Sequence, residues 1–303
     1  MLIFTRRALH RGKFTDNAAS LTRYGAPRRA GNAWRLKQLS EAQWHSAIDA
    51  ESGDGTILLY IHGYNTTQSG LFRRLARIEA GLRAEGFRGA VVGYDWPSLG
   101  KPLSYSSDRT MAKAIARYLV EDGIWPLLAR TPRPRLHLMA HSMGCYVTLK
   151  ALAQFGDGTG SRRWLREVAF TACDVDHNLM RKGAVGTLLL NNRALRFTHY
   201  YNPLDEVLAV PGRIINGGRR RSGRLGMIGP RYPSHWDVSC QAQFRRDAKG
   251  TAGSDFENML LSHSWWFDNP GFLKDLAATL DGADAATLAT RQRLSNGDQR
   301  LLT

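Results

Sequence analysis

Residues 136–147 read LHLMAHSMGCYV, and this stretch decides the fold. Its first part, Leu136 to Met139, has the apolar composition of a strand that is buried on both faces. The apolar pattern resumes with Val147 and Leu149, which we expect to lie on a helix. Between them stands Ser142, with small residues two positions before and two positions after it. The stretch therefore predicts a strand that turns abruptly into a helix, with a serine hydroxyl exposed at the turn.

The same alternation of buried strands and amphipathic helices runs along most of the chain. The predicted strands comprise residues 2–5, 56–61, 90–94, 136–139, 168–173, 195–201 and, as the last one, 236–241. Helical spacing of apolar residues is found around residues 39–48, 71–82, 111–119, 147–151 and 272–280. Such βαβ units build parallel sheets. We therefore predict an α/β fold, with a mainly parallel sheet flanked by helices on both faces.

The regular pattern occupies the middle of the chain and defines its expected organisation. Residues 55–281 form the predicted core, and no linker rich in proline, glycine and serine divides it. Residues 1–54 mix a short strand, a polar stretch and a helix, and we expect an N-terminal extension packed on the core. Residues 282–303 are polar and are expected to form a C-terminal tail.

The composition is that of a globular protein with a strong positive charge. Hydrophobic residues make up 43% of the 303 positions, and the formal net charge is +16. Because no nucleic-acid-binding module is recognisable, an arginine-rich solvated surface explains the charge best. No apolar stretch is long enough for a transmembrane segment, and arginines interrupt the N-terminus where a signal peptide needs an apolar run. We therefore expect a cytoplasmic protein.

The chain has three cysteines, Cys145, Cys173 and Cys240. Their spacing fits neither a zinc site nor a disulfide framework. We expect them to be small buried residues in a reducing compartment. The sequence predicts no metal and no cofactor.

Ser142 lies in the pentapeptide Ala140-His-Ser-Met-Gly144, which matches a nucleophile elbow except at its first residue. Alanine replaces the usual first glycine there and adds only one methyl group. Backbone N–H groups at the start of the new helix point toward the same space as the hydroxyl, with the positive end of the helix dipole behind them. The alternative is an ordinary helix N-cap serine. The elbow interpretation makes Ser142 a candidate nucleophile.

A serine nucleophile needs a histidine to accept its proton and an acid to orient that histidine. Where the serine stands in a nucleophile elbow of an α/β fold, the three residues follow in the chain order Ser, acid, His. Four histidines follow Ser142. His177 comes before the acid of the next strand, His199 lies inside a predicted strand, and His235 precedes the predicted last strand. His263 lies in an expected loop after that strand and before the closing helix, where the base is required. The alternative for His263 is a structural histidine that caps the helix.

The acid is expected just beyond a strand. Asp205 follows the predicted strand 195–201, which a proline at position 203 ends, and it is the preferred candidate. Asp174, directly after the predicted strand 168–173, is the alternative acid, and Asp176 is a weaker one. Each of them could instead cap a helix.

When a serine attacks a carbonyl group, the carbonyl oxygen becomes negatively charged. Two backbone N–H groups, together called the oxyanion hole, are needed to stabilise it. One is expected to be the N–H group of Met143. The other is expected from Tyr64, because Gly63 permits a tight turn in the segment Ile61-His-Gly-Tyr-Asn65. His62, in the same segment, is expected to pack or to orient a neighbour rather than to act as a second base.

Four segments carry a resemblance to a known superfamily. They are residues 60–66 with HGYN, 94–98 with WPS, 138–144 with AHSMG, and 261–266 with SHS before two tryptophans. Over roughly residues 55–280 the chain resembles the α/β-hydrolase superfamily and, more narrowly, a bacterial branch that is a domain family of unknown function. Alanine is usual in the elbow of that branch, whereas glycine is commoner where this chain has Ser262. Residues 172–176 resemble a recurrent segment after a strand, and Asp205 corresponds to the aspartate after the next strand.

The residues and the resemblance together predict a cofactor-independent serine hydrolase that cleaves carboxylic esters through an acyl-enzyme intermediate. A lipase, a phospholipase or a thioesterase with the same triad is the alternative among enzymes. A non-catalytic basic binding protein on a hydrolase scaffold is the alternative of another class. The expected partner is a small-molecule or lipid ester. The arginines at positions 219, 220, 221 and 224 raise the hypothesis of an anionic substrate or surface, against that of a solvated loop.

Overall fold

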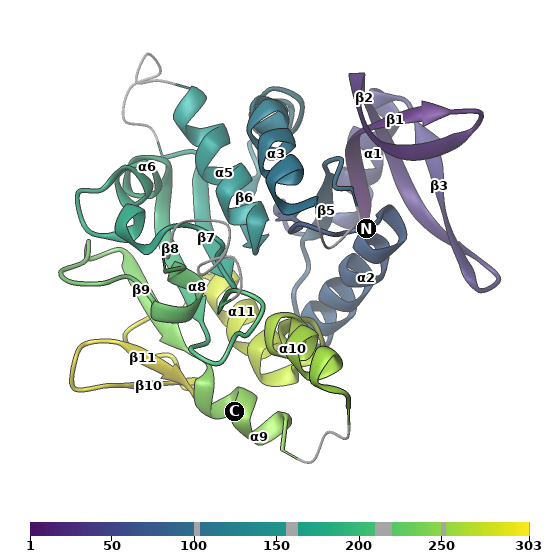
Figure 1. Cartoon of the computed structure of the whole chain (residues 1–303). Coiled ribbons are helices and arrows are strands. Elements are labelled where there is room, and N and C mark those ends of the chain that lie inside the picture. The colour runs from purple at the N-terminus through teal and green to yellow at the C-terminus, as the bar shows by residue number, and fades with distance from the viewer. Residues whose placement is uncertain (100–103, 156–162, 210–219, 250–252, 303) are drawn as a thin grey trace.

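The computed structural model describes residues 1–99, 104–155, 163–209, 220–249 and 253–302, in which one sheet of eleven strands runs through the molecule (Figure 1). The strands are β1 (Leu2–His10), β2 (Lys13–Ala30), β3 (Ala33–Leu39), β4 (Thr56–Ile61), β5 (Ala90–Asp95), β6 (Arg135–His141), β7 (Leu165–Thr171), β8 (Ala194–Tyr201), β9 (His235–Ser239), β10 (Arg291–Arg293) and β11 (Gln299–Leu301). The α-helices are α1 (Glu41–Glu51), α2 (Gln68–Ala84), α3 (Tyr105–Leu119), α4 (Trp125–Leu128), α5 (Met143–Gln154), α6 (Val185–Arg193), α8 (Ser222–Leu225), α9 (Gln241–Asp247), α10 (Asp255–Ser264) and α11 (Pro270–Asp281). Single turns of other helix types cover Val120–Ile124 (η2), His177–Met180 (η4) and Trp265–Asp268 (η5).

The sheet is parallel in its centre and antiparallel at both ends. Its strand order is β10-β11-β9-β8-β7-β6-β4-β5-β1-β2-β3. Every neighbouring pair from β11 to β1 is parallel, whereas β2 and β3 at one end and β10 at the other pair antiparallel. This arrangement confirms the predicted α/β class with a mainly parallel sheet.

Helices cover both faces of the sheet, which explains the continuous apolar runs of the central strands. In β4, Ile57, Leu59 and Ile61 belong to one core cluster, and Leu58 and Tyr60 belong to the other. Because successive side chains of a strand point to opposite faces, each cluster fills one side of the sheet. Figure 1 shows α3 and α5 on one side and α2 and α11 on the other. The carboxyl ends of the parallel strands meet at one edge, where the predicted site residues are expected.

Both ends of the chain differ from the prediction. The strand expected at residues 2–5 continues to His10, and the polar stretch after it forms β2 and β3. The prediction that residues 236–241 form the last strand is wrong, since β11 and β10 follow β9 in the sheet. The sheet therefore runs across the expected boundaries after residues 54 and 281, and the three-part division of the chain stays a prediction.

A buried histidine in β6 should make the stability of the fold depend on pH. His137 is 4% exposed, and neither of its ring nitrogens has a hydrogen-bond partner in the part of the chain that the structure describes. Burial lowers the pKa of His137 from 6.5 to about 3, and the nearby Arg135, Arg166 and Arg196 lower it further. The folded protein thus keeps this imidazole neutral at pH values where the unfolded chain binds a proton. The stability contributed by neutral His137 is present above pH 6.5 and is lost as the pH falls toward 3.

We expect this loss to be measurable by comparison with His137→Leu, which cannot take up the proton. Between pH 6.5 and 4.5, the free energy of unfolding should fall by about 2 kcal/mol more in the natural protein than in the variant. Urea denaturation of both proteins at both pH values measures the difference. His62 and His235, whose pKa values burial also lowers, are present in both proteins, so their contribution cancels. Equal losses in the two proteins would contradict the prediction.

Candidate active site

Ser142 lies between the last residue of β6 and the first residue of α5. Its backbone has φ 57° and ψ −124°, a conformation with positive φ that residues other than glycine rarely adopt. The turn is held by backbone hydrogen bonds: the Ser142 N–H group donates to Thr171 at 3.0 Å, and its carbonyl accepts from Cys145 at 3.1 Å and from Asp174 at 3.2 Å. Such an over-determined, strained turn is typical of a nucleophile elbow. It sets Ser142 at the carboxyl edge of the sheet.

Two glycines let the neighbouring segments approach the elbow. A Cβ atom on Gly144 would lie 2.4 Å from the carbonyl oxygen of Ile61, so α5 could not pack this closely on β4 with any other residue. A Cβ atom on Gly63 would lie 2.7 Å from the Cβ atom of Ser142. The loop after β4, which we expected beside Ser142, is therefore packed directly against it.

His263 is paired with Asp205. Its Nδ1 atom lies 2.7 Å from Oδ2 of Asp205, and the other carboxylate oxygen accepts from the Leu208 N–H group at 3.0 Å. Asp205 is fully buried, whereas the His263 side chain is 13% exposed. Because a carboxylate only accepts hydrogen bonds, we assign the proton of the neutral imidazole to Nδ1, which leaves Nε2 as an acceptor. This is the form in which a histidine can take a proton from a hydroxyl group.

The expected loop around His263 is in fact a helix, so that part of the prediction is wrong. Ser254 and Glu257 form a capping box that begins α10, and the helix continues through His263 to Ser264. A capping box satisfies backbone N–H groups that a helix start leaves without partners, so it stabilises the helix locally. His263 thus belongs to the last turn of α10, immediately before η5.

The end of α10 is tied to the elbow. The carbonyl oxygen of His263 accepts from Nε2 of His141 at 2.9 Å and from Nε1 of Trp266 at 3.1 Å. The centroids of the two imidazole rings are 4.7 Å apart. Since His141 directly precedes Ser142, these contacts bring His263 and the elbow together from positions far apart in the sequence.

Asp174, the alternative acid, is engaged elsewhere. Its Oδ1 atom lies 3.0 Å from Nε of Arg221, and its Oδ2 atom accepts from the Tyr105 hydroxyl at 2.8 Å. Burial raises the pKa of Asp174 even though Arg221 and Tyr105 act in the opposite direction. The weaker candidate, Asp176, caps η4 by accepting from the Asn178 N–H group at 3.0 Å. Of the three carboxylates, Asp205 is the one that the fold pairs with His263.

Other polar residues near the sheet edge have structural partners of their own. His62 is buried, its Nδ1 lies 2.8 Å from the Gly63 carbonyl oxygen, and its ring stacks on Trp96. Burial lowers the pKa of His62 to about 3, so it stays neutral. In β8, burial alone would lower the pKa of His199, but hydrogen bonding to Asp237 raises it to about 9. Neither histidine is placed as His263 is.

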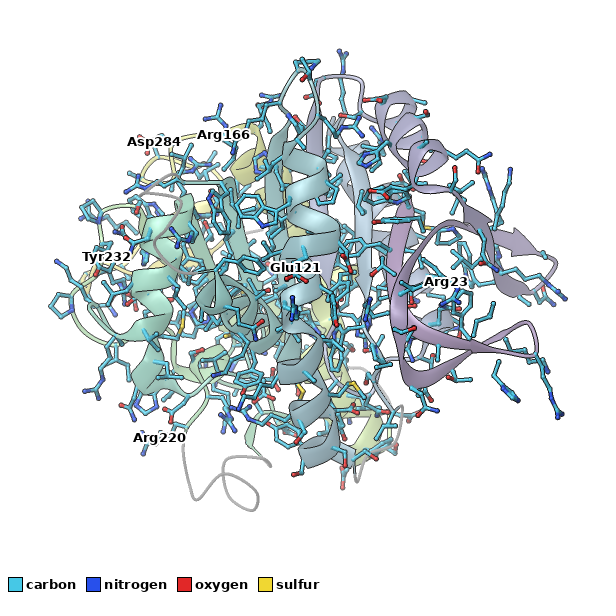
Figure 2. All side chains as sticks on the ribbon, turned by 90° about the horizontal axis from the view of Figure 1, so that it is seen from above. Arg23, Glu121, Arg166, Arg220, Tyr232 and Asp284 are labelled. Carbon is cyan, nitrogen blue, oxygen red and sulfur yellow. The ribbon has the colours of Figure 1, made fainter. Side chains whose placement is uncertain are left out.

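The arginines expected to attract anions are largely used inside the protein. Arg219 lies outside the described residues. Arg221 is 2% exposed and paired with Asp174, and Arg224 donates to the Pro203 carbonyl at 2.7 and 3.1 Å. Arg220 is exposed, at the periphery of the molecule in Figure 2. An anionic substrate or surface at this loop stays a prediction, and it now depends on Arg220 among the described positions.

Three residues make contacts near the candidate site that the sequence did not predict. His141 was visible in the elbow pentapeptide, but no local pattern indicates that its side chain reaches the carbonyl of residue 263. Tyr105 and Arg221 both contact Asp174 and are 116 residues apart in the sequence. Such contacts are set by the tertiary fold, and the sequence offers no signal for them.

Within the described residues, no group of three or more His, Cys, Asp and Glu side chains is arranged to hold a metal ion. The three cysteines are buried and free. No helix in the described ranges is both long enough and apolar enough to cross a membrane.

The fold and the site now define the class of the protein. The sheet is mainly parallel, and Ser142 lies in a strained turn at the end of its central strand β6. Farther along the chain, Asp205 after β8 is paired with His263 at the end of α10. This is the arrangement of an α/β-hydrolase. The chain belongs to the family described as alpha/beta hydrolase of unknown function (DUF900), whose model matches residues 37–259. This match confirms the resemblance drawn from the sequence.

Similar proteins were found at lower levels of likeness. An uncharacterized protein of Nostoc sp. is 40% identical over 65 residues, which cover 22% of this chain and 17% of that protein. An esterase of Pyrobaculum calidifontis is 8% identical with a TM-score of 0.33, covering 74% of this chain and 75% of its own. The phospholipase PlaB of Legionella pneumophila is 10% identical with a TM-score of 0.35, covering 79% and 66%. The family match, rather than these scores, identifies the fold.

Proposed function

We propose that this protein is a serine hydrolase that cleaves carboxylic esters through an acyl-enzyme intermediate. The observation that carries the proposal is the 2.7 Å hydrogen bond between His263 and Asp205. His263 lies at the end of α10, and its carbonyl oxygen is bonded to His141, the residue before Ser142. Ser142 is the proposed nucleophile, Asp205 the orienting acid and His263 the base, and this is the chain order that the fold uses. Asp174 is not assigned this role, because Arg221 and Tyr105 occupy its oxygens.

In the proposed reaction, Oγ of Ser142 attacks the carbonyl carbon of the ester while Nε2 of His263 accepts the hydroxyl proton. Asp205 stabilises the imidazolium that forms and keeps the ring in place. The tetrahedral intermediate then expels the alcohol, which receives the proton from His263. Water then attacks the acyl group while His263 accepts its proton, the bond between the acyl carbon and Oγ of Ser142 breaks, and His263 returns the proton to Oγ as the carboxylic acid product leaves. These steps need no metal and no cofactor.

The Met143 and Tyr64 N–H groups are proposed to bind the oxyanion. Met143 is the first residue of α5, and the first N–H groups of a helix have no partner within the helix. Tyr64 follows Gly63, which is packed against Ser142. A single donor of this kind typically stabilises the transition state by about 3 kcal/mol.

Labelling with a fluorophosphonate probe tests the proposal, because the probe reacts with serines that a neighbouring base activates. We expect one covalent adduct, located on Ser142 by peptide mass spectrometry, and no adduct on heat-unfolded protein. The same sample should turn over a soluble short-chain aryl ester. Parallel assays with micellar long-chain lipids and with acyl thioesters distinguish an esterase from a lipase, a phospholipase or a thioesterase. A folded protein that neither reacts with the probe nor hydrolyses any of these esters would refute the proposal and leave the non-catalytic alternative.

A further inference from the structure

One buried side chain contacts all three segments that build the candidate site. His141 ends β6 and is 1% exposed. Its Nε2 atom is 2.9 Å from the His263 carbonyl oxygen, and its ring centroid lies 5.0 Å from that of Phe267 in η5. On the other side, a Cβ atom added to Gly63 would lie 3.3 Å from Nδ1 of His141. The imidazole therefore fills the space between the elbow, the loop after β4 and the end of α10.

The hydrogen bond to His263 fixes the protonation of this imidazole. A carbonyl oxygen only accepts, so Nε2 of His141 must carry the proton. Burial lowers the pKa of His141 well below its ordinary value, and the neighbouring His263, Arg74 and His62 lower it further. Burial thus favours the neutral imidazole, which donates from Nε2.

The acceptor lies where a helix needs outside partners. The last carbonyl groups of a helix have no N–H partner within it, and His263 is in the last turn of α10. Two side chains fill this need, but they differ in what they connect. Trp266 is three residues from His263 and lies in the adjoining turn η5, whereas His141 is 122 residues away and belongs to the sheet. The bond from His141 therefore fixes the helix end relative to the elbow.

We propose that His141 is a positioning residue, which sets the place of His263 relative to Ser142 by donating to the backbone carbonyl of the base. The proposal rests on the proposed function, because it takes His263 as the base. In this proposal His141 acts on the reaction through its bond to the His263 backbone and takes no part in bond making or proton transfer. A displacement of reacting groups by about 1 Å can cost about 100-fold in rate, so a single bond between the two segments is enough to matter.

Two substitutions of His141 separate the hydrogen bond from the space that the ring fills. A glutamine side chain would offer an amide N–H group near the position of Nε2, whereas leucine has a similar volume and no donor. We expect His141→Leu to lower kcat for a soluble aryl ester by about 100-fold while KM changes by no more than about twofold. His141→Gln should retain activity within about fivefold of the natural protein. If His141→Leu does not fold, His141→Asn replaces it, since its shorter amide does not reach the carbonyl.

A second readout does not require turnover. The proton in the His263–Asp205 hydrogen bond is expected as a low-field NMR signal, assigned by its absence in His263→Gln. We expect that signal to be kept in His141→Gln and to be broadened or lost in His141→Leu. A natural protein that shows the signal but hydrolyses no ester would refute the proposed function and still test the role of His141. Equal losses of kcat in His141→Gln and His141→Leu, or an unchanged signal in His141→Leu, would overturn the positioning role.

Discussion

Ser142→Ala is expected to lower kcat for ester hydrolysis by at least about 10⁴-fold. Alanine has no oxygen to attack the ester, so the oxyanion donors and His263 remain without a nucleophile to assist. The substitution should leave the fold intact, because the hydrogen bonds that hold the turn come from the backbone of residue 142. Alanine also tolerates a positive φ in this protein, since Ala172 adopts φ 46°.

Steady-state assays with a soluble aryl ester measure the loss, and circular dichroism with thermal unfolding checks the fold. Ser264→Ala is the matched control, because it removes a hydroxyl group one residue after His263 whose hydrogen bond goes to the Leu260 carbonyl. We expect the control to keep activity within a few-fold. Full turnover in Ser142→Ala would show that another residue performs the reaction.

The centre of the fold and the strand-to-helix turn at Ser142 were predictable because their signals are local. A strand buried on both faces is mostly apolar, as residues 57–61 are, and a strand that turns at once into a helix needs small residues around the turn. Gly144 illustrates the second point, because the backbone of β4 leaves no room for a Cβ atom there. These constraints act on a few neighbouring residues and are therefore visible in the sequence.

The parts that were missed depend on exposure or on distant contacts. Strand β2 is mostly exposed or half-buried, so it has no apolar run to identify it, and its pairing with β1 and β3 places it in the sheet. The helix around His263 begins at a capping box formed by Ser254 and Glu257. This two-residue pattern is present in the sequence, but the prediction of a loop overlooked it. Asp174 and Asp205 both follow strands, and the sequence left both open as the acid. In the fold, they differ because Asp205 is bonded to His263, whereas Asp174 is engaged by Arg221 and Tyr105.

Asp205→Asn tests the choice of acid directly and is expected to lower kcat by about 10³- to 10⁴-fold. The carbonyl oxygen of asparagine can keep the bond from the Leu208 N–H group, which places its amide group toward Nδ1 of His263. An amide donates at that position, so it favours the tautomer with the proton on Nε2. The base then has no free lone pair to accept the Ser142 proton. Stability should change little, because shape and most hydrogen bonds are kept.

Asp174→Asn is the matched counterpart, and it is expected to lower stability while leaving kcat nearly unchanged. It leaves the Arg221 guanidinium, whose side chain is 1% exposed, without a charge partner, and such a loss costs about 3 kcal/mol or more of unfolding free energy. The kcat of the molecules that remain folded should stay within a few-fold. Urea denaturation and steady-state kinetics on both variants measure the two effects, and exchanged outcomes would assign the acid to Asp174. The physical distinction is that Arg221 is a permanent cation, which binds its carboxylate throughout. In the proposed reaction, by contrast, His263 is a cation only in the transition state and intermediates, so the bond to Asp205 is expected to act on kcat rather than on stability.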